Sequence, residues 1–148
     1  MRITQESDYA LRIVTALALA DSTVDAGTLS EETSVTPRFT LKILHKLVHS
    51  GIVSSSKGAN GGYRLSRPAE NLTMKDVIEA IEGPIIIARC LHSDENCSQN
   101  GLVKSDCRYH HIFREVSSQV ADTFSGIRIA DVISSTQKER KEAKSSEL

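Results

Sequence analysis

Residues 36–68 read TPRFTLKILHKLVHSGIVSSSKGANGGYRLSRP and decide the fold. A threonine followed by proline suits the N-cap and the first position of a helix. Apolar residues then recur at helical spacing until Gly51 ends the run, and they are Phe39, Ile43, Leu44, Leu47 and Val48. The opposite face offers polar and basic side chains to solvent or to a ligand, namely Arg38, Thr40, Lys42, His45 and Lys46. The stretch before Gly51 is therefore predicted to be an amphipathic helix with a basic exposed face.

The second half of this stretch predicts a β-hairpin. Residues 52–56 alternate weakly as a strand, residues 57–62 (KGANGG) form a glycine-rich turn, and residues 63–65 can return as a second strand. Glycines at 58, 61 and 62 permit positive φ and a close approach to phosphates, where a Cβ would intrude.

Two helices are predicted before this unit. Apolar residues recur at helical spacing over about residues 5–20, and residues 26–34 form a short helix with Asp25 as its N-cap. Short helices joined by a tight turn and followed by a basic hairpin make a winged helix-turn-helix, whose later helix can enter a major groove while the wing meets the DNA backbone or minor groove. The expected fold class is mostly α with a small β-hairpin wing.

Charge is distributed unevenly along the 148 residues. The net charge is −1, yet residues 36–67 contain six Lys and Arg and no Asp or Glu, so the rest of the chain carries −7. A charge run alone is usually a solvated helix face. Here it coincides with a helix and a hairpin that suit DNA, which favours a nucleic-acid partner.

Beyond the hairpin, two more helices are expected. Thr73 and Asp76 form a variant of the capping box before a helix that Gly83 ends, and this helix should pack on the first. A longer helix over about residues 107–124 carries an apolar stripe of Tyr109, Ile112, Phe113, Val116, Val120 and Phe124. This stripe favours a two-fold dimer, with packing inside the chain as the alternative.

These elements predict a division into four parts. A winged helix-turn-helix domain covers residues 1–83, a loop 84–108, a dimerisation helix with a short terminal element 109–133, and a charged, disordered tail 134–148.

All three cysteines and three of the five histidines lie within residues 89–111. An odd number of cysteines argues against a disulfide framework. Separately, no stretch of the sequence approaches the roughly 18 consecutive apolar residues that a membrane span needs. A reducing, cytoplasmic location is expected, where thiolates bind metal. The chain also lacks a C-x-x-C pair or a substrate-pocket motif, so an enzyme is not expected.

The chain resembles the bacterial winged-helix regulator family that contains IscR, NsrR, RirA and CymR. The resemblance rests on the opening MRIT-x3-DYALR, the helix after Thr36, the wing KG-x-NGGY-x-L, the helix MKDVI-x-AIEG and the late IADVI, and it covers about residues 1–133. It implies a dimeric, operator-binding transcriptional regulator, most often a repressor.

The resemblance also implies a cofactor. IscR-like and NsrR-like members hold an iron–sulfur cluster through three cysteines in this loop and sense redox state, nitric oxide or iron–sulfur status, whereas CymR-like members lack the set. Cys90, Cys97 and Cys107 stand at the matching places, with gaps of six and nine residues instead of the common five and five. The fourth ligand is either His110, as in the [2Fe-2S] pattern, or Asp8 from the other subunit, as in the [4Fe-4S] pattern.

Several alternatives stay open at this loop. Asp8 could be an ordinary acid of a first helical turn, and His110 a surface histidine, while His92 and His111 are weaker ligand candidates. The same loop could hold a structural zinc as Cys3His or act as a cysteine-based redox switch.

The expected DNA contacts lie on the basic helix and the wing. From the helix we expect Arg38 and Lys42, with Thr36, Phe39 and Thr40 near them, to approach double-stranded operator DNA. From the wing we expect Lys57, Asn60, Gly61, Gly62 and Tyr63, with Arg2, Thr4 and Arg64 as further phosphate contacts.

Overall fold

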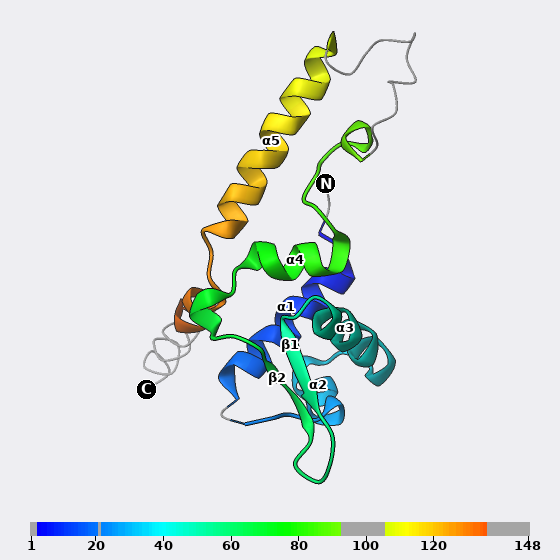
Figure 1. Cartoon of the computed structure of the whole chain (residues 1–148), viewed down its shortest axis with the longest axis vertical. Coiled ribbons are helices and arrows are strands. Elements are labelled where there is room, and N and C mark those ends of the chain that lie inside the picture. The colour runs from blue at the N-terminus through cyan, green and yellow to red at the C-terminus, as the bar shows by residue number, and fades with distance from the viewer. Residues whose placement is uncertain (1–2, 21, 93–105, 136–148) are drawn as a thin grey trace, which may run out of the picture.

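The structure of the protein is a computed structural model that describes residues 3–20, 22–92 and 106–135. Within these residues, helices packed around one core form one end of the molecule, and a long helix projects away from it (Figure 1). The elements are α1 (Gln5–Leu19), α2 (Ala26–Thr33), α3 (Pro37–His49), β1 (Val53–Ser56), β2 (Gly62–Leu65), η1 (Ala69–Asn71), α4 (Met74–Glu82), η2 (Arg89–Leu91) and α5 (Arg108–Ser125). Residues 129–135 are also helical, and none of the described helices is long and apolar enough to cross a membrane.

Helix α1 lies at the centre of the core. Its buried side packs against α2, α3, α4 and β2, so one amphipathic helix organises the surrounding elements. The expected packing of α4 on α1 is confirmed. The fully buried side chains come from all parts of the unit and include Ile13, Val14, Leu29, Ile43, Leu44, Leu47, Leu72 and Val77.

Side-chain caps fix where the helices begin. Asp25 accepts a hydrogen bond of 3.0 Å from the Thr28 amide at the start of α2. At the start of α4 the Thr73 hydroxyl accepts from the Asp76 amide at 3.2 Å, and the Asp76 carboxylate accepts from the Thr73 amide at 2.9 Å. Each such cap contributes about 1 kcal/mol. Both predicted caps are confirmed, whereas Thr36 occupies the N-cap position of α3 without a side-chain cap bond.

The turn between α2 and α3 depends on one residue in the left-handed region. Ser34 has φ 54° and ψ 38°, and its amide donates to the carbonyl of Glu31. The Ser30 hydroxyl donates to the carbonyl of Val35 at 2.6 Å, which satisfies that buried acceptor. The tight turn places α3 against α2 in the helix-turn-helix arrangement that the sequence predicts.

The wing is a two-stranded antiparallel hairpin in which Val53 pairs with Leu65 and Ser56 with Gly62. Val24, ahead of α2, extends this pairing because its amide and carbonyl both bond to Tyr63, at 2.9 and 2.8 Å. The hairpin therefore has its base tied to the helical core, and its tip, residues 57–61, projects beyond the helices (Figure 1).

The chain returns to the core after α5. The Met74 amide donates to the carbonyl of Ile127 at 2.9 Å, and the Ile129 amide donates to the carbonyl of Leu72 at 2.8 Å. The Ile129 side chain is 1% exposed and belongs to the same apolar cluster as α1 and α3. The sequence assigns residues 109–133 to the dimerisation helix and a short terminal element. In the structure, the last residues of this range pack in the winged-helix core.

Candidate nucleic-acid interface and cysteine segment

The outward face of α3 carries both cations and apolar groups. Arg38, Lys42 and His45 are exposed, as the sequence predicts, and Phe39, which the periodicity assigns to the apolar face, is exposed as well. The prediction that Thr40 lies on the exposed face is wrong because its side chain is fully buried. Its hydroxyl donates a hydrogen bond to the carbonyl of Val35. A small β-branched residue in the first turns of α3 lies close enough to the α2–α3 turn to be covered by it.

Leu41 is an exposed residue of α3 that the sequence analysis missed. Its side chain is 52% exposed, next to Lys42 and one turn from Arg38. A leucine in an amphipathic pattern is normally assigned to the core. Periodicity could nevertheless have indicated that Leu41 is exposed, because buried positions recur every three or four residues and position 41 does not follow or precede the buried positions 40 and 43 at that spacing. An exposed apolar group on this face suits contact with a thymine methyl.

Phe39 is exposed, but it is anchored. Its ring lies edge-on to Tyr9 of α1 with centroids 6.2 Å apart, and the Lys42 ammonium lies 5.9 Å from its centroid. The start of α3 is therefore held against α1 while one side of the aromatic ring stays accessible.

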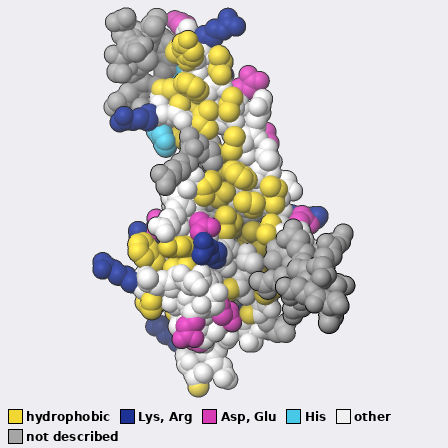
Figure 2. Space-filling view, turned by 180° about the vertical axis from the view of Figure 1, so that it is seen from behind, with side chains coloured by type: hydrophobic (Ala, Val, Ile, Leu, Met, Phe, Trp, Pro, Cys, Tyr) yellow, Lys and Arg dark blue, Asp and Glu magenta, His cyan; other side chains and the backbone are white. Residues whose placement is uncertain are grey.

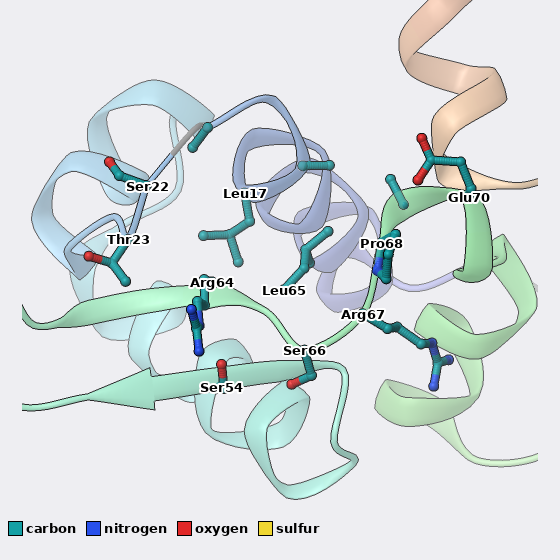
Figure 3. Close-up of a pocket in the computed structure, with 13 residues that line it drawn as sticks. Leu17, Ser22, Thr23, Ser54, Arg64, Leu65, Ser66, Arg67, Pro68 and Glu70 are labelled. Carbon is teal, nitrogen blue, oxygen red and sulfur yellow. The ribbon is translucent and has the colours of Figure 1, made fainter.

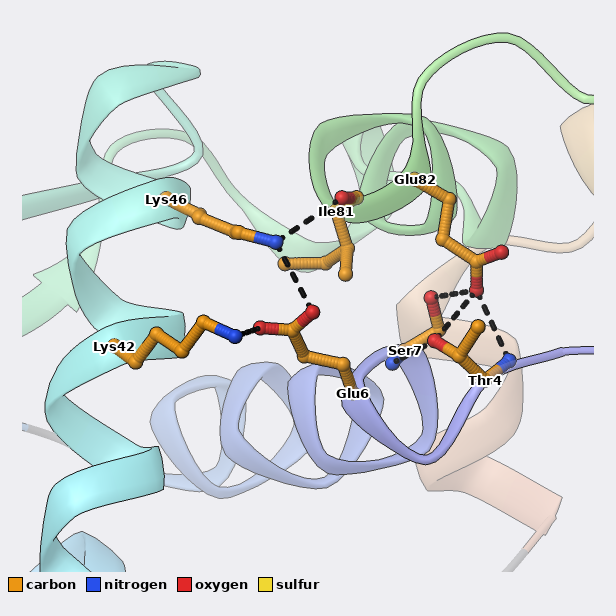
Figure 4. A network of polar contacts seen from close by, with 7 residues as sticks. All are labelled: Thr4, Glu6, Ser7, Lys42, Lys46, Ile81 and Glu82. Atoms are coloured by element: carbon orange, nitrogen blue, oxygen red, sulfur yellow. Dashed lines mark hydrogen bonds and ion pairs between the residues drawn. The ribbon is translucent and has the colours of Figure 1, made fainter.

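Two lysines of α3 are paired with one carboxylate from α1. Lys42 Nζ lies 2.8 Å from Glu6 Oε1, and Lys46 Nζ lies 3.1 Å from Glu6 Oε2 (Figure 4). The pKa of Glu6 is held below its usual range, chiefly by its contact with Lys42, so Glu6 is ionised at neutral pH. The +6 charge of residues 36–67 is thus partly compensated by an acid that lies outside that stretch in the sequence.

A third cation is compensated in the same way. Arg67 lies 3.1 Å from Asp76 of α4. Among the described residues, the remaining cations of residues 36–67, which are Arg38, Lys57 and Arg64, form no ion pair, and all three are exposed. The charge available to an anionic ligand is therefore concentrated at the start of α3 and on the wing.

Close steric contacts explain why the wing has glycine at positions 61 and 62. A Cβ on Gly61 would lie 2.5 Å from the carbonyl oxygen of Ser56, and a Cβ on Gly62 would lie 2.8 Å from that of Val24. Gly62 also has φ +150°. The tip exposes Lys57 and Asn60, while Tyr63 is half-buried against the core, which makes it an anchor of the wing more than a free contact.

At the base of the wing a shallow hollow faces solvent between β2, the end of α1 and η1 (Figure 3). Its floor includes Leu17 and Leu65, and its rim carries Arg64, Arg67 and Glu70 among serine and threonine hydroxyls. Its open shape and its mixed charges make it a poor enclosure for a small molecule.

The expected phosphate contacts of Arg2 and Thr4 stay a prediction. Arg2 lies outside the described residues. The Thr4 amide and hydroxyl both donate to Glu82, at 3.1 and 3.0 Å, and the Ser7 hydroxyl donates to the same carboxylate oxygen (Figure 4). Thr4 therefore joins the start of α1 to the end of α4. Burial alone would raise the pKa of Glu82, but the bonds from Ser7 and Thr4 outweigh it, and the net pKa is lowered.

Two of the three cysteines are described. Cys90 lies in η2 and Cys107 at the N-cap of α5; both are partly buried thiols outside any disulfide. η2 packs on α5, and the segment before it is tethered there because the Ser117 hydroxyl accepts from the Ile87 amide at 3.1 Å. Cys97 lies outside the described residues.

The proposed fourth ligands are separated by the fold. His110 is in the first turn of α5, three residues after Cys107. Asp8 is on α1 and forms an ion pair of 2.6 Å with Arg12. Within the described parts of the chain, no group of three or more His, Cys, Asp or Glu side chains is arranged to hold a metal ion. Cys90, Cys107 and His110 are nevertheless residue types that can ligate a metal.

Helix α5 exposes an apolar stripe. Tyr109, Ile112, Phe113 and Val116 are all exposed, and the rings of Tyr109 and Phe113 stack with centroids 6.4 Å apart. Apolar side chains gather along the projecting part of the molecule in Figure 2. In this chain alone, the stripe is not covered by the described residues.

Comparison with known proteins agrees with this architecture. The model of the Rrf2 family, described as iron-dependent transcriptional regulators, matches residues 3–135. The chain belongs to the Rrf2 family. It is therefore a DNA-binding transcriptional regulator, and the family resemblance and the winged-helix fold expected from the sequence are both confirmed.

One sequence relative and two solved structures illustrate the range of this Rrf2 protein's relatives. A protein of Aquifex aeolicus, named as an HTH-type transcriptional regulator, is 31% identical over 131 residues, which are 88% of this chain and 90% of the relative. The structure of T. potens IscR matches with a TM-score of 0.73 at 17% identity, over 94% of this chain and 90% of that one. The structure of CymR, the global cysteine regulator of B. subtilis, matches with a TM-score of 0.69 at 20% identity, over 90% and 97%.

Proposed function

We propose that this Rrf2 protein reads operator DNA with α3 and the wing, as a homodimer joined through α5, and that its cysteine segment holds an iron–sulfur cluster that reports redox state, nitric oxide or cluster supply. The observation that carries the DNA part is the position of the exposed cations without an ion-pair partner in the described chain. Arg38 at the start of α3 and Lys57 and Arg64 on the wing belong to the two elements that a winged helix presents to DNA.

The two elements have different tasks in this proposal. Helix α3 presents Arg38, Phe39 and Leu41, a cation beside apolar groups, which suits base edges in a major groove. The wing presents Lys57 with glycines that let the backbone come close, which suits phosphates. Arg38 should therefore contribute to discrimination between sequences, and Lys57 to affinity for any duplex.

Substituting Arg38 and Lys57 separately tests this division. Lys57→Ala should weaken binding to all duplexes and lower the slope of log affinity against log salt by about 0.9, the value for one lost phosphate contact. Arg38→Ala should reduce the preference for a selected operator over random DNA by about tenfold, within the range of about 1–3 kcal/mol for one base contact. Fluorescence anisotropy with labelled duplexes at several salt concentrations measures both quantities.

The control is Lys75→Ala, which removes a lysine from α4 at a position outside α3 and the wing. It should leave both the slope and the operator preference close to those of the native protein. An unchanged slope in Lys57→Ala would remove the wing from the interface, and an unchanged preference in Arg38→Ala would remove α3 from base recognition.

For the cofactor, Cys90, Cys97 and Cys107 would hold the cluster, with His110 or with Asp8 of the partner subunit as the fourth ligand. When bound, the cluster supplies redox-active iron with one ligand that is not a thiolate and is therefore more easily lost. The chain's own contribution is to hold η2 on α5 through Ser117, which keeps Cys90 and Cys107 on packed elements.

Anaerobic purification tests the cofactor. We expect a coloured protein with bound iron and sulfide, and we expect Cys107→Ser to lose the colour and the iron while keeping the helical circular dichroism spectrum. Ser105→Ala, a change at a neighbouring non-ligand position, is the control and should keep the colour. A colourless native protein with one zinc per chain would instead support the structural zinc site of the Cys3His type.

A further inference from the structure

Glu6 is the acidic partner of α3 and is placed beside the proposed DNA-reading face. Its carboxylate lies within 3.1 Å of two lysine ammonium groups, Lys42 and Lys46, and its own side chain is only 22% exposed (Figure 4). A carboxylate is an acceptor for lysine in the same way as a phosphate oxygen. Before any DNA arrives, α3 therefore already carries an internal anion at the place where phosphates would bind its lysines.

The carboxylate of Glu6 is held in place by the fold. The first turn of α1 is fixed at Glu82, which accepts hydrogen bonds from the Thr4 amide and hydroxyl and from the Ser7 hydroxyl. Ion pairs at a surface are weak partly because two mobile side chains must be ordered. Here the backbone that carries Glu6 is already ordered by the end of α4, so the pair with α3 needs less additional ordering.

The two lysines are not equally available to a phosphate. The Lys46 side chain is 33% exposed and also donates to the carbonyl of Ile81 at 3.3 Å. The Lys42 side chain is 56% exposed, and Glu6 is its ion-pair partner in the described chain. Lys42 is therefore the lysine that a phosphate could recruit if Glu6 released it.

We infer that Glu6 limits the affinity of this protein for any DNA duplex by competing with DNA phosphates for Lys42. This inference rests on the proposed role of α3 in DNA binding and names a residue of α1 as part of its control. With Lys42 neutralised, binding through α3 depends on the contacts of Arg38 and its apolar neighbours with base edges, which differ between sequences. Without Glu6, Lys42 adds a contact with the phosphate backbone, which is the same in every duplex and raises affinity without sequence preference.

The test is Glu6→Gln, which keeps the size of the side chain and removes its charge. Binding to a random duplex and to a selected operator is measured by anisotropy at several salt concentrations. We expect the salt slope to increase by about 0.9, for one additional phosphate contact, and random-duplex affinity at 0.1 M salt to rise on the order of tenfold. Operator affinity should rise by a similar factor, because the added phosphate contact is the same in every duplex, so the ratio of operator to random binding should stay close to the native value.

Two further variants separate this effect from a general change in charge. Glu70→Gln removes the same charge from η1, outside the Glu6 contacts, and should leave the slope and the random-duplex affinity close to the native values. Glu6→Gln combined with Lys42→Gln should return the slope to near the native value. Thermal unfolding by circular dichroism confirms that each variant is folded. If Glu6→Gln does not fold, Glu6→Ala, which also removes the charge, takes its place, and an unchanged slope in that variant would overturn the inference.

The outcomes distinguish this inference from the proposed function. If Arg38→Ala loses operator preference but Glu6→Gln changes neither the salt slope nor the affinity for a random duplex, the role of Glu6 is wrong while the role of α3 stands. The same conclusion follows if the slope stays high after Lys42→Gln is added. If Arg38→Ala has no effect on binding by a protein that does bind DNA, the proposed interface itself is wrong.

Discussion

Replacing Ile129 by alanine is expected to lower the free energy of unfolding of this protein by about 2–5 kcal/mol, the usual range for removing a large aliphatic side chain from a packed core. The Ile129 side chain is 1% exposed and belongs to the apolar core to which α1 and α3 also contribute residues. Its backbone amide also bonds to Leu72, so the segment has little freedom to move into the space that the alanine would leave. Urea unfolding followed by circular dichroism measures the loss.

The matched control is Leu19→Ala at the end of α1. Leucine and isoleucine are isomers, so the same atoms are removed, but the Leu19 side chain is 51% exposed. Its expected cost is below about 1 kcal/mol because little packed surface is lost. Equal losses in the two variants would show that residues after α5 do not contribute to the winged-helix core.

The position of Ile129 also shows what the sequence could not reveal about the fold. The pattern of residues 129–133 predicts a short element near the dimerisation helix. Its attachment is made by backbone bonds to residues 72 and 74, and backbone groups are the same in every residue type. A sequence pattern therefore contains no record of this pairing, whereas the helices, their caps and the hairpin are predictable from periodicity, N-cap residues and glycines.

The charge pattern was informative but incomplete for a similar reason. Residues 36–67 contain no acid, which correctly marks α3 and the wing as the basic part of the chain. The two acids that pair with Lys42, Lys46 and Arg67 come from α1 and α4. Only the packing of those helices on α3 and the hairpin brings them close, so the net charge of a stretch overstates the charge that a ligand meets.

The cysteine segment is the part of the candidate site that the sequence predicts least completely. Its residue types and order predict a thiolate-bound group, and the structure places Cys90 and Cys107 on packed elements. The third cysteine lies outside the described residues, and the choice between His110 and Asp8 depends on how two chains meet. That choice stays a prediction, because the spacing of ligands within one chain does not contain the geometry of a dimer.

Introducing a charge into the apolar stripe of α5 is expected to have the largest effect on assembly and on operator binding. In Ile112→Asp, a carboxylate replaces a side chain that is 43% exposed in the single chain and that the proposed dimer would cover. In a two-fold interface each substitution counts twice, and each site loses about 1.5–3 kcal/mol of apolar burial and gains an unpaired charge. A dimer of micromolar or weaker stability should therefore dissociate completely.

Sedimentation equilibrium measures the association, and anisotropy measures operator affinity in the same variant. Because a dimer reads two half-sites together, we expect loss of dimerisation to weaken operator binding by at least about a hundredfold. Ser118→Asp is the matched control, since it places the same carboxylate at another exposed position of α5, on the face away from the stripe, and it should remain dimeric. If Ile112→Asp stays dimeric, or if it binds the operator as tightly as the native protein, the stripe on α5 is not the surface that joins the two DNA-reading heads.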